Sequence, residues 1–242
     1  MKNYTDESYG EHIAGMYDVL YGSFDLQAID FLAELAGGGP ALELGIGTGR
    51  IALPLKSRGV EVHGIDASPA MVSKLHAKPG GADIPVDIGS FADVNVSGEF
   101  SLIYVVFNTF FALVTQDDQI RCLTNAASHL ARDGCLVIEA FVPDMARFTA
   151  QQVMRAIAVE LDEVHIDVSR YDPVTQIITS QHIILTENGT RLFPVQIRYV
   201  WPSEMDLMAR LAGLRLVERW GGWDRSAFSE ESKSHISVYK KA

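Results

Sequence analysis

The stretch Ala41-Leu-Glu-Leu-Gly-Ile-Gly-Thr-Gly-Arg50 decides the fold class of this 242-residue chain. An apolar run that contains one acid, Glu43, leads directly into three alternating glycines, Gly45, Gly47 and Gly49. Glycine lets the backbone approach a ligand and adopts positive φ in a tight turn, and the helix expected next offers unpaired backbone N–H groups. A simple turn rarely needs this composition. The stretch therefore predicts a ligand site where a buried strand turns into a helix.

Short apolar runs rich in branched residues alternate with helical patterns around this stretch. The runs predicted as strands are 41–46, 61–65, 84–88, 102–107 and 136–141. The predicted helices are 9–20, 26–36, 50–58, 69–77 with Ser68 as its cap, and 117–131 beginning at Asp117 or Asp118. Alternation of this kind is typical of a parallel sheet with helices on both faces.

The pattern changes after Pro143. Apolar and polar residues alternate over 158–170, 175–186 and 192–201, and Asn188-Gly189 is a strong hairpin signal, so we expect an antiparallel insert. A helix over 202–213 and two strands, 214–220 and 234–240, then complete the main sheet as an antiparallel pair. The predicted fold is α/β: a Rossmann-like, seven-stranded, mostly parallel sheet with helices on both faces, plus an antiparallel β insert.

Charge and composition limit the class of partner. With 48% hydrophobic and 21% charged residues the chain has the composition of a globular protein. Its net charge of -11 argues against nucleic acid or an anionic membrane as partner and favours a small molecule. Its two cysteines lie in apolar contexts, and neither a secretory-type N-terminus nor eighteen uninterrupted apolar residues occur, so we expect a cytoplasmic protein.

The residue after the glycines separates two kinds of nucleotide site. A dinucleotide fingerprint that begins at Gly45 and Gly47 requires a third glycine or an alanine at position 50, which is Arg50. The stretch also lacks the Gly-Lys-Ser/Thr of a phosphate-binding loop. Neither a pyrophosphate nor a triphosphate is therefore the favoured ligand.

The stretch Glu43-Leu-Gly-Ile-Gly-Thr-Gly49 resembles the first motif of class I S-adenosylmethionine-dependent methyltransferases. Gly64-Ile-Asp66-Ala-Ser68 resembles their second motif, in which the acid accepts hydrogen bonds from the ribose hydroxyls. Val86-Asp87-Ile88 resembles the segment whose acid contacts the adenine amino group and whose next residue packs on the ring. The residues 102–111 match the fourth strand and the loop where the methyl group faces its acceptor. Taken alone, Asp66 also suits a helix cap and Asp87 a turn.

The resemblance implies an enzyme of the methyltransferase class with S-adenosylmethionine as cofactor and S-adenosylhomocysteine as product. It implies entry or lid helices over 1–40, a cofactor-binding core over 41–150, the β insert over 151–201 as an acceptor cover or a contact in a homo-oligomer, and a C-terminal helix with closing strands over 202–242. The cofactor contacts it implies are Tyr17, Glu43, Gly45, Gly47, Asp66, Ala67, Asp87, Ile88 and Phe107.

The acceptor is expected to be a small molecule. The Asn/Asp-Pro-Pro-Tyr motif of nucleic-acid and some protein amino-methyltransferases is replaced by Phe107-Asn108-Thr109-Phe110, and no carboxylate and histidine cluster has the spacing of metal ligands. The general layout is similar to bacterial amine methylases of antibiotic and sugar biosynthesis. We therefore predict transfer to an amine nitrogen of a secondary metabolite. Open alternatives are a small-molecule O-methyltransferase, a noncatalytic cofactor-binding regulator or scaffold, and a nicotinamide-dependent oxidoreductase, which Arg50 disfavours.

Four residues are candidates for contact with the acceptor. Tyr9, Ile13, Tyr17 and Tyr21 follow at intervals of four residues, which puts three phenols on one helix stripe. We select Tyr9 and Tyr17 as catalytic, although tyrosines that merely pack the helix are equally consistent. Glu139 interrupts an apolar strand at the end where α/β sheets bind ligands, and it either recognises an amine or pairs with a structural arginine. Phe110 is a candidate wall of an apolar pocket or a packing residue. His12 and His182 are weaker candidates for a base.

Overall fold

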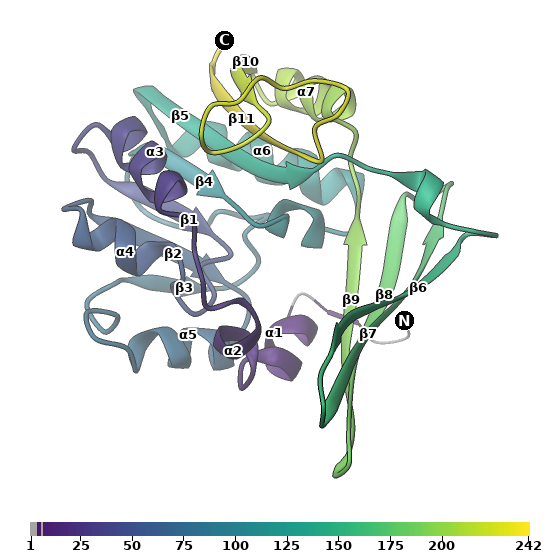
Figure 1. The fold of residues 1–242 in the computed structure, drawn as a ribbon. Helices are drawn as coiled ribbons and strands as arrows, with labels where there is room; N and C mark the ends of the chain where they lie inside the picture. The colour runs from purple at the N-terminus through teal and green to yellow at the C-terminus, as the bar shows by residue number, and fades with distance from the viewer. Residues whose placement is uncertain (1–3, 6) are drawn as a thin grey trace.

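The computed structural model describes residues 4, 5 and 7–242 (Figure 1). Its main sheet has seven strands in the order β10 (Leu214–Trp220), β11 (Ser234–Lys241), β5 (Leu130–Phe141), β4 (Phe100–Val105), β1 (Ala41–Leu44), β2 (Val62–Asp66) and β3 (Val86–Ile88). Strands β1 to β5 pair in parallel, and β11 runs antiparallel to both β5 and β10. The predicted mostly parallel sheet with an antiparallel closing pair is confirmed.

Helices cover both faces of this sheet. One face packs on α3 (Leu26–Ala36), α4 (Ala52–Ser57) and α5 (Pro69–His76), and the other on α6 (Gln116–His129) and α7 (Pro202–Leu211). Neighbouring residues of β4 point to opposite faces: Leu102 packs in the core beneath α3, α4 and α5, and Ile103 in the core beneath α6 and α7. With both faces buried, the strand reads in sequence as a continuous apolar run. Of the segment 1–40, α3 is thus a core helix of the sheet rather than part of a lid.

A second, antiparallel sheet stands beside the core (Figure 1). It contains β6 (Gln152–Val159), β7 (Glu163–Asp172), β8 (Ile177–Thr186) and β9 (Gly189–Arg198) in that order, after the short 3-10 helix η2 (Met145–Arg147). The single strand predicted over 158–170 is wrong: a turn at 160–162 divides two strands. The predicted hairpin is present, but Thr186 pairs with Gly189, so the loop is Glu187-Asn188, one residue earlier than the Asn-Gly pair.

The N-terminal helix predicted over 9–20 is two short helices, α1 (Ser8–Ile13) and α2 (Tyr17–Tyr21). Gly15 lies between them, and glycine inside a helix is unfavourable by about 1 kcal/mol relative to alanine. The break lets Ile13 pack against Met71 and Phe193, so α1 joins the core to the second sheet.

Several predicted helix ends are confirmed by their capping bonds. Ser68 caps α5, because its hydroxyl accepts the Met71 N–H at 3.2 Å, and α3 ends at Gly37 with φ +57°. Helix α6 begins earlier than predicted, since Thr115 rather than Asp117 or Asp118 is its cap. Within the described part of the chain, none of the helices is long and apolar enough to cross a membrane.

Candidate active site

A pocket of about 450 Å³ lies at the carboxyl ends of β1, β2 and β4. Strands β2 and β4 flank β1 on opposite sides, so the chain reverses its direction of progress across the sheet at this point. Open α/β sheets bind their ligands at such a switch point. The pocket is lined by the glycine loop after β1, by the segments that follow β2, β3 and β4, by the helices α1 and α2, and by one face of the second sheet.

The glycine loop has the backbone that only glycine adopts readily. Gly45, Gly47 and Gly49 have φ of +75°, +55° and +76°. A Cβ on Gly45 would lie 2.4 Å from the Thr109 methyl carbon, which is too close for any side chain. Because these positions carry no side chains, the backbone of the loop is accessible to a ligand in the pocket.

Asp66 stands at the end of β2 and faces this loop. Its carboxylate accepts the Gly47 N–H at 2.7 Å and the Ser68 N–H at 2.8 Å. Burial raises the pKa of Asp66, and the two backbone donors oppose that rise. Because an ionised carboxylate has about four acceptor positions, two remain for a ligand. Ser68 fills the capping role at α5, and both Asp66 and Ala67 line the pocket.

Glu43 lies beneath the loop and is buried. Its Oε2 accepts the Tyr104 hydroxyl at 3.0 Å, and its residue also lines the pocket. Burial raises the pKa of Glu43 to about 8, although Tyr104 and Arg50 lower it. The carboxyl group is thus mainly protonated at neutral pH, and it offers the pocket a hydrogen-bond donor as well as an acceptor.

Phe107 and Asn108 form a strained turn after β4. Both have left-handed backbone, with φ of +57° and +64°, and both line the pocket. Glu139 on β5 holds this turn: its Oε2 accepts the Phe107 N–H at 2.7 Å and its Oε1 accepts the Trp223 Nε1–H at 3.1 Å. The carboxylate does not line the pocket. Glu139 interrupts the apolar strand because it supports this turn, and not because it contacts an acceptor.

Phe110 also lies outside the pocket. The short 3-10 helix η1 (Thr109–Ala112) turns its ring into the core beneath the sheet, where 0% of the residue is exposed. The expected pocket wall is therefore a packing residue. Thr109, Ala112 and Leu113 of the same segment do line the pocket.

The predicted adenine contacts Asp87 and Ile88 lie at the end of β3 (Val86–Ile88). Asp87 and Ile88 are exposed, 55% for Ile88, and neither lines the pocket. Ser90 and Phe91 line it instead. Strand β3 is the last of the sheet, so its final residues lie at an edge that no further strand covers. The position of the chain relative to the pocket depends on the loop that follows, which periodicity does not predict.

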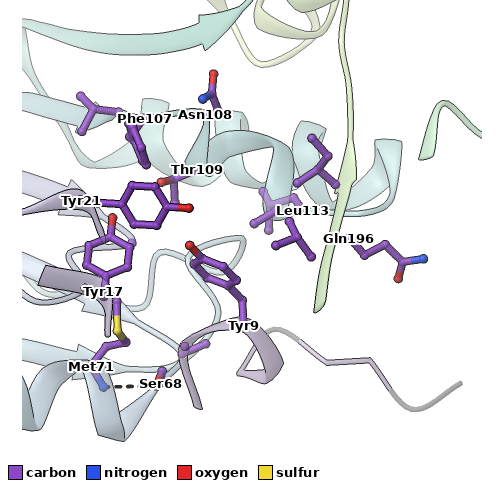
Figure 2. Close-up of a pocket in the computed structure, with 18 of the residues that line it drawn as sticks. Tyr9, Tyr17, Tyr21, Ser68, Met71, Phe107, Asn108, Thr109, Leu113 and Gln196 are labelled. Carbon is purple, nitrogen blue, oxygen red and sulfur yellow. Dashed lines mark hydrogen bonds between the residues drawn. The ribbon is translucent and has the colours of Figure 1, made fainter. Parts of the chain in front are cut away.

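Three phenol side chains from the N-terminal helices converge over the glycine loop. Figure 2 shows Tyr9, Tyr17 and Tyr21 pointing toward one another beneath Phe107. The ring centroids of Tyr17 and Tyr21 are 5.3 Å apart, and those of Tyr21 and Phe107 5.5 Å. Burial raises the pKa of Tyr17 to about 12 and that of Tyr9 further. All three phenols are consequently neutral at physiological pH.

Polar contacts tie these helices to the loop. Asp18 of α2 accepts the Thr48 hydroxyl at 2.6 Å and pairs with Lys78 at 2.8 Å. The Arg50 guanidinium donates to the Tyr21 carbonyl at 3.3 Å and lies 4.0 Å over the Phe107 ring. Arg50, whose presence at this position argues against a dinucleotide fingerprint, thus holds Tyr21 and α2 at the pocket.

The second sheet supplies a polar wall that sequence analysis missed, except for His182. Asp167 and Ser169 of β7 and Ser180 and His182 of β8 face the pocket opposite the glycine loop. The Ser169 hydroxyl donates to Asp167 at 2.9 Å, and the two serine oxygens are 2.7 Å apart. Burial lowers the pKa of His182. The sequence pattern pointed the other way, because alternation along β7 predicts its apolar residues to be buried, whereas Asp167 and Ser169 are buried and Val168 is exposed.

Comparison with known proteins identifies the family. The CcbJ methyltransferase from Streptomyces caelestis is 38% identical, with a TM-score of 0.91 over 99% of this chain and 100% of that one. The chain belongs to the S-adenosylmethionine-dependent methyltransferases. Residues 41–134 of this methyltransferase match the family model described as a methyltransferase domain. No curated protein matches the chain.

Two further solved structures share the fold of this methyltransferase. The amino pentose methyltransferase CalS10 from Micromonospora echinaspora is 20% identical, with a TM-score of 0.71 over 94% of this chain and 97% of that one. The sugar N-methyltransferase KedS8 from Streptoalloteichus is 18% identical, with a TM-score of 0.67 over 93% of each chain. At these identities the likeness extends to the fold.

The cofactor of this methyltransferase is S-adenosylmethionine. The pocket fits a nucleoside with an amino-acid arm, because Gly45 and Gly47 expose backbone and Asp66 keeps two acceptor positions for vicinal hydroxyls. A methyl group on a sulfonium reacts by in-line displacement, in which positive charge disperses. The protein's part in such a step is to align the two reactants and to exclude water.

Proposed function

We propose that this methyltransferase transfers the methyl group to an amine nitrogen of a small-molecule acceptor. One observation carries the proposal: three phenols, Tyr9, Tyr17 and Tyr21, converge over the glycine loop, and their raised pKa values keep them protonated, so they are not available as bases at neutral pH. An uncharged amine already has its lone pair and needs alignment, whereas a hydroxyl must lose its proton to become a comparable nucleophile. A roof of hydrogen-bonding but non-basic groups therefore suits an amine.

The reaction balances without a base in the protein. When bound, S-adenosylmethionine supplies a methyl carbon on a sulfonium; the amine lone pair forms the new N–C bond while the C–S bond breaks and leaves its electron pair on sulfur. Tyr9 and Tyr17 hold the amine through their hydroxyls and stabilise the positive charge that develops on nitrogen through their ring faces. The extra proton on nitrogen then passes to water as the product leaves.

We further propose which residues contact each part of the cofactor. Asp66 accepts the ribose hydroxyls, Gly45 and Gly47 line the amino-acid arm, and Ala67 packs beside the ribose. At the adenine, Ser90 and Phe91 replace the expected Asp87 and Ile88, because they are the residues of this segment in the pocket. Tyr17, Phe107 and the protonated Glu43 border the sulfonium side.

The size and charge of the molecule favour a metabolite as acceptor. A cavity of about 450 Å³ is in the range of small-molecule sites, and the net charge of -11 is unfavourable for nucleic acid. We propose that the activity belongs to secondary metabolism of the antibiotic type, and the support is that CalS10, which shares the fold, is involved in calicheamicin biosynthesis. O-methylation is the second candidate, and a specific residue favours it: His182 lines the pocket, and burial lowers its pKa so that the imidazole is neutral and able to accept a proton.

The test compares Tyr9→Phe with wild type, using methyl-labelled S-adenosylmethionine and a panel of primary and secondary amines with their alcohol counterparts. We expect transfer to nitrogen only, and a loss of kcat of about tenfold in Tyr9→Phe, the equivalent of one lost hydrogen bond. Calorimetric affinity for S-adenosylhomocysteine should stay within a factor of about two, since Tyr9 contacts the acceptor rather than the cofactor.

Tyr171→Phe is the matched control, because this phenol belongs to the second sheet and lies outside the pocket. It should retain wild-type kcat. Label recovered on the alcohols and not on the amines, with activity lost in His182→Asn, would replace the proposal with O-methylation. Cofactor binding without transfer to any acceptor would indicate a noncatalytic protein.

A further inference from the structure

The second sheet presents a cluster of buried polar side chains to the pocket, and the methyl-transfer step proposed above does not use it. Asp167, Ser169 and Ser180 are 5%, 4% and 8% exposed, and all three line the pocket. The alternating pattern of β7 and β8 leads one to expect apolar residues on this inner face, and burial of polar groups costs stability unless they have partners. We propose that this cluster is a subsite for hydroxyl groups, so that the acceptor is an amine carrying several hydroxyls.

The register of the two strands builds the cluster. Asp167 pairs across β7 and β8 with His182, and Ser169 pairs with Ser180. Arg155 stands opposite Asp167 on β6, with its Nε 3.4 Å from the carboxylate. The central strands of an antiparallel sheet are rigid and well placed to hold a substrate in one orientation. The inference rests on the proposed function, because it concerns the acceptor of that same pocket.

The direction of the hydrogen bonds shows which atoms are free to bind. The Ser169 hydroxyl donates its proton to Asp167, so in the 2.7 Å contact between the serines Ser180 is the donor. The Ser180 oxygen then keeps both lone pairs, and the carboxylate keeps about two of its four acceptor positions. The free atoms at the centre of the cluster are acceptors, and Arg155 at its rim adds donors.

The charges around the cluster distinguish hydroxyls from an ammonium group. Arg155 pairs with Asp167, Arg147 also lines the pocket, and burial keeps His182 neutral, so the wall has no net negative charge. A cation would meet two guanidinium groups there. An amine paired with a carboxylate would moreover stay protonated and would lack the lone pair that methyl transfer requires. Hydroxyls avoid both problems, because they donate to Asp167 and Ser180 and accept from arginine.

The cluster is near enough to the phenols for one molecule to reach both. The three phenols and the cluster residues line one pocket of about 450 Å³, and α1 packs against β9 of the second sheet. The amine therefore lies under Tyr9 and Tyr17 while hydroxyls on the same molecule reach the second sheet. A site built to bind hydroxyls rejects analogues that lack them, because its buried polar groups are then left unpaired.

The test uses two probes that share a six-membered ring and one amine: methyl glucosaminide, which has several hydroxyls, and cyclohexylamine, which has none. Methyl transfer to each is measured with labelled S-adenosylmethionine, and each kcat/KM is expressed per unprotonated amine, because cyclohexylamine is the stronger base and only the unprotonated form has the lone pair. We expect wild type to favour the hydroxylated probe by at least about tenfold in kcat/KM. Asp167→Asn and the milder Ser180→Ala should each lose most of that preference through a higher KM for methyl glucosaminide, with little change for cyclohexylamine.

Asp162→Asn is the matched control, since it removes one carboxylate from the exposed turn between β6 and β7. Affinity for S-adenosylhomocysteine shows that each variant is folded and loaded. Equal kcat/KM for the two probes in wild type, or a preference that survives in both cluster variants, overturns the hydroxyl subsite and leaves amine methylation standing. Cofactor binding with no transfer to either probe, or to any amine of the wider panel, contradicts the proposed function itself.

Discussion

Glu43 illustrates what a single residue contributes beneath the cofactor loop. The glycines around it are explained by backbone conformation, but an acid under them is not. Its burial, its bond from Tyr104 and a pKa of about 8 describe a carboxyl group that the fold holds in the protonated form. In the unfolded chain the same group titrates near 4.5. The two values differ, so the stability of this protein depends on pH.

The Glu43→Gln variant tests this dependence. A raised folded pKa gives a contribution to stability that is complete below pH 4.5 and is lost as pH rises through about 8. Between those values the folded state binds one more proton, so the free energy of unfolding of wild type falls by about 1.4 kcal/mol per pH unit from this group. Urea unfolding from pH 5 to 8 should show a flatter profile for Glu43→Gln. Parallel profiles for wild type, Glu43→Gln and the exposed-site control Glu187→Gln would contradict the assignment.

At the scale of elements, the turn after β4 depends on its neighbour β5. Two consecutive left-handed residues, Phe107 and Asn108, are unfavourable without glycine and persist because other groups hold them. Glu139 binds the Phe107 N–H, and the Asn108 Oδ1 accepts the Phe141 N–H at 2.7 Å. Glu139 of β5 therefore fixes the shape of the pocket although its own side chain does not line it.

The Glu139→Gln variant should disturb this turn. The amide oxygen can still accept a hydrogen bond, but the NH₂ group must then face either the Phe107 N–H or the Trp223 Nε1–H. We therefore expect a loss of about 1–2 kcal/mol in the free energy of unfolding. Adding Trp223→Phe removes one of the two donors, and a double-mutant cycle should show coupling of about 1 kcal/mol.

The exposed pair of Trp220 and Glu218 provides the control for this cycle. The Trp220 Nε1–H donates to the Glu218 carboxylate at 3.0 Å, which is the same kind of hydrogen bond as that between Trp223 and Glu139, but in contact with solvent. Glu218→Gln should change stability by less than about 0.5 kcal/mol. Equal losses for Glu139→Gln and Glu218→Gln would show that the half-buried Glu139 carboxylate does not hold the turn.

At the scale of the whole molecule, the position of the second sheet decides what the pocket can accept. The sheet is fastened at the end of β9 by Arg198, which is 6% exposed. Its guanidinium donates to Gln119 of α6 at 2.7 Å and to Glu204 of α7 at 2.7 Å, and Gln119 returns a bond to the Arg198 carbonyl. This network joins the polar wall of the acceptor side to the helices of the cofactor core.

The Arg198→Met variant should loosen that connection. It leaves the half-buried Glu204 without its cation and with only Gln116 and Gln176 as donors, so we expect a loss of about 2–3 kcal/mol in stability. Limited proteolysis should cut first in the connections at 142–151 and 199–201. The double variant Arg198→Met with Glu204→Leu should recover much of the loss, because both charges are gone. Arg191→Met, at the exposed far end of β9, is the control. Unchanged stability in Arg198→Met would show that the network does not fasten the sheet.

Local patterns were sufficient for the main sheet and much of the cofactor side. Apolar periodicity predicted its strands and the core helices, and specific residues such as Ser68 and Gly37 marked helix ends, because both signals act within a few residues of the chain. The same reasoning failed where a break depends on packing, as between α1 and α2, and where a charged segment hides a strand, as in the first half of β5.

Amino-acid types were sufficient to predict the glycine loop and Asp66, since φ requirements and hydrogen-bonding chemistry belong to residue types; the tyrosines were candidates that packing explained equally well. Tertiary structure alone decided which other side chains reach the pocket. It turned Phe110 into the core and Glu139 behind a turn, left Asp87 exposed, and brought Asp167 from the second sheet to face a loop more than a hundred residues earlier. Periodicity reports that a face is buried; the partner that buries it is set by contacts between distant segments, which no local pattern contains.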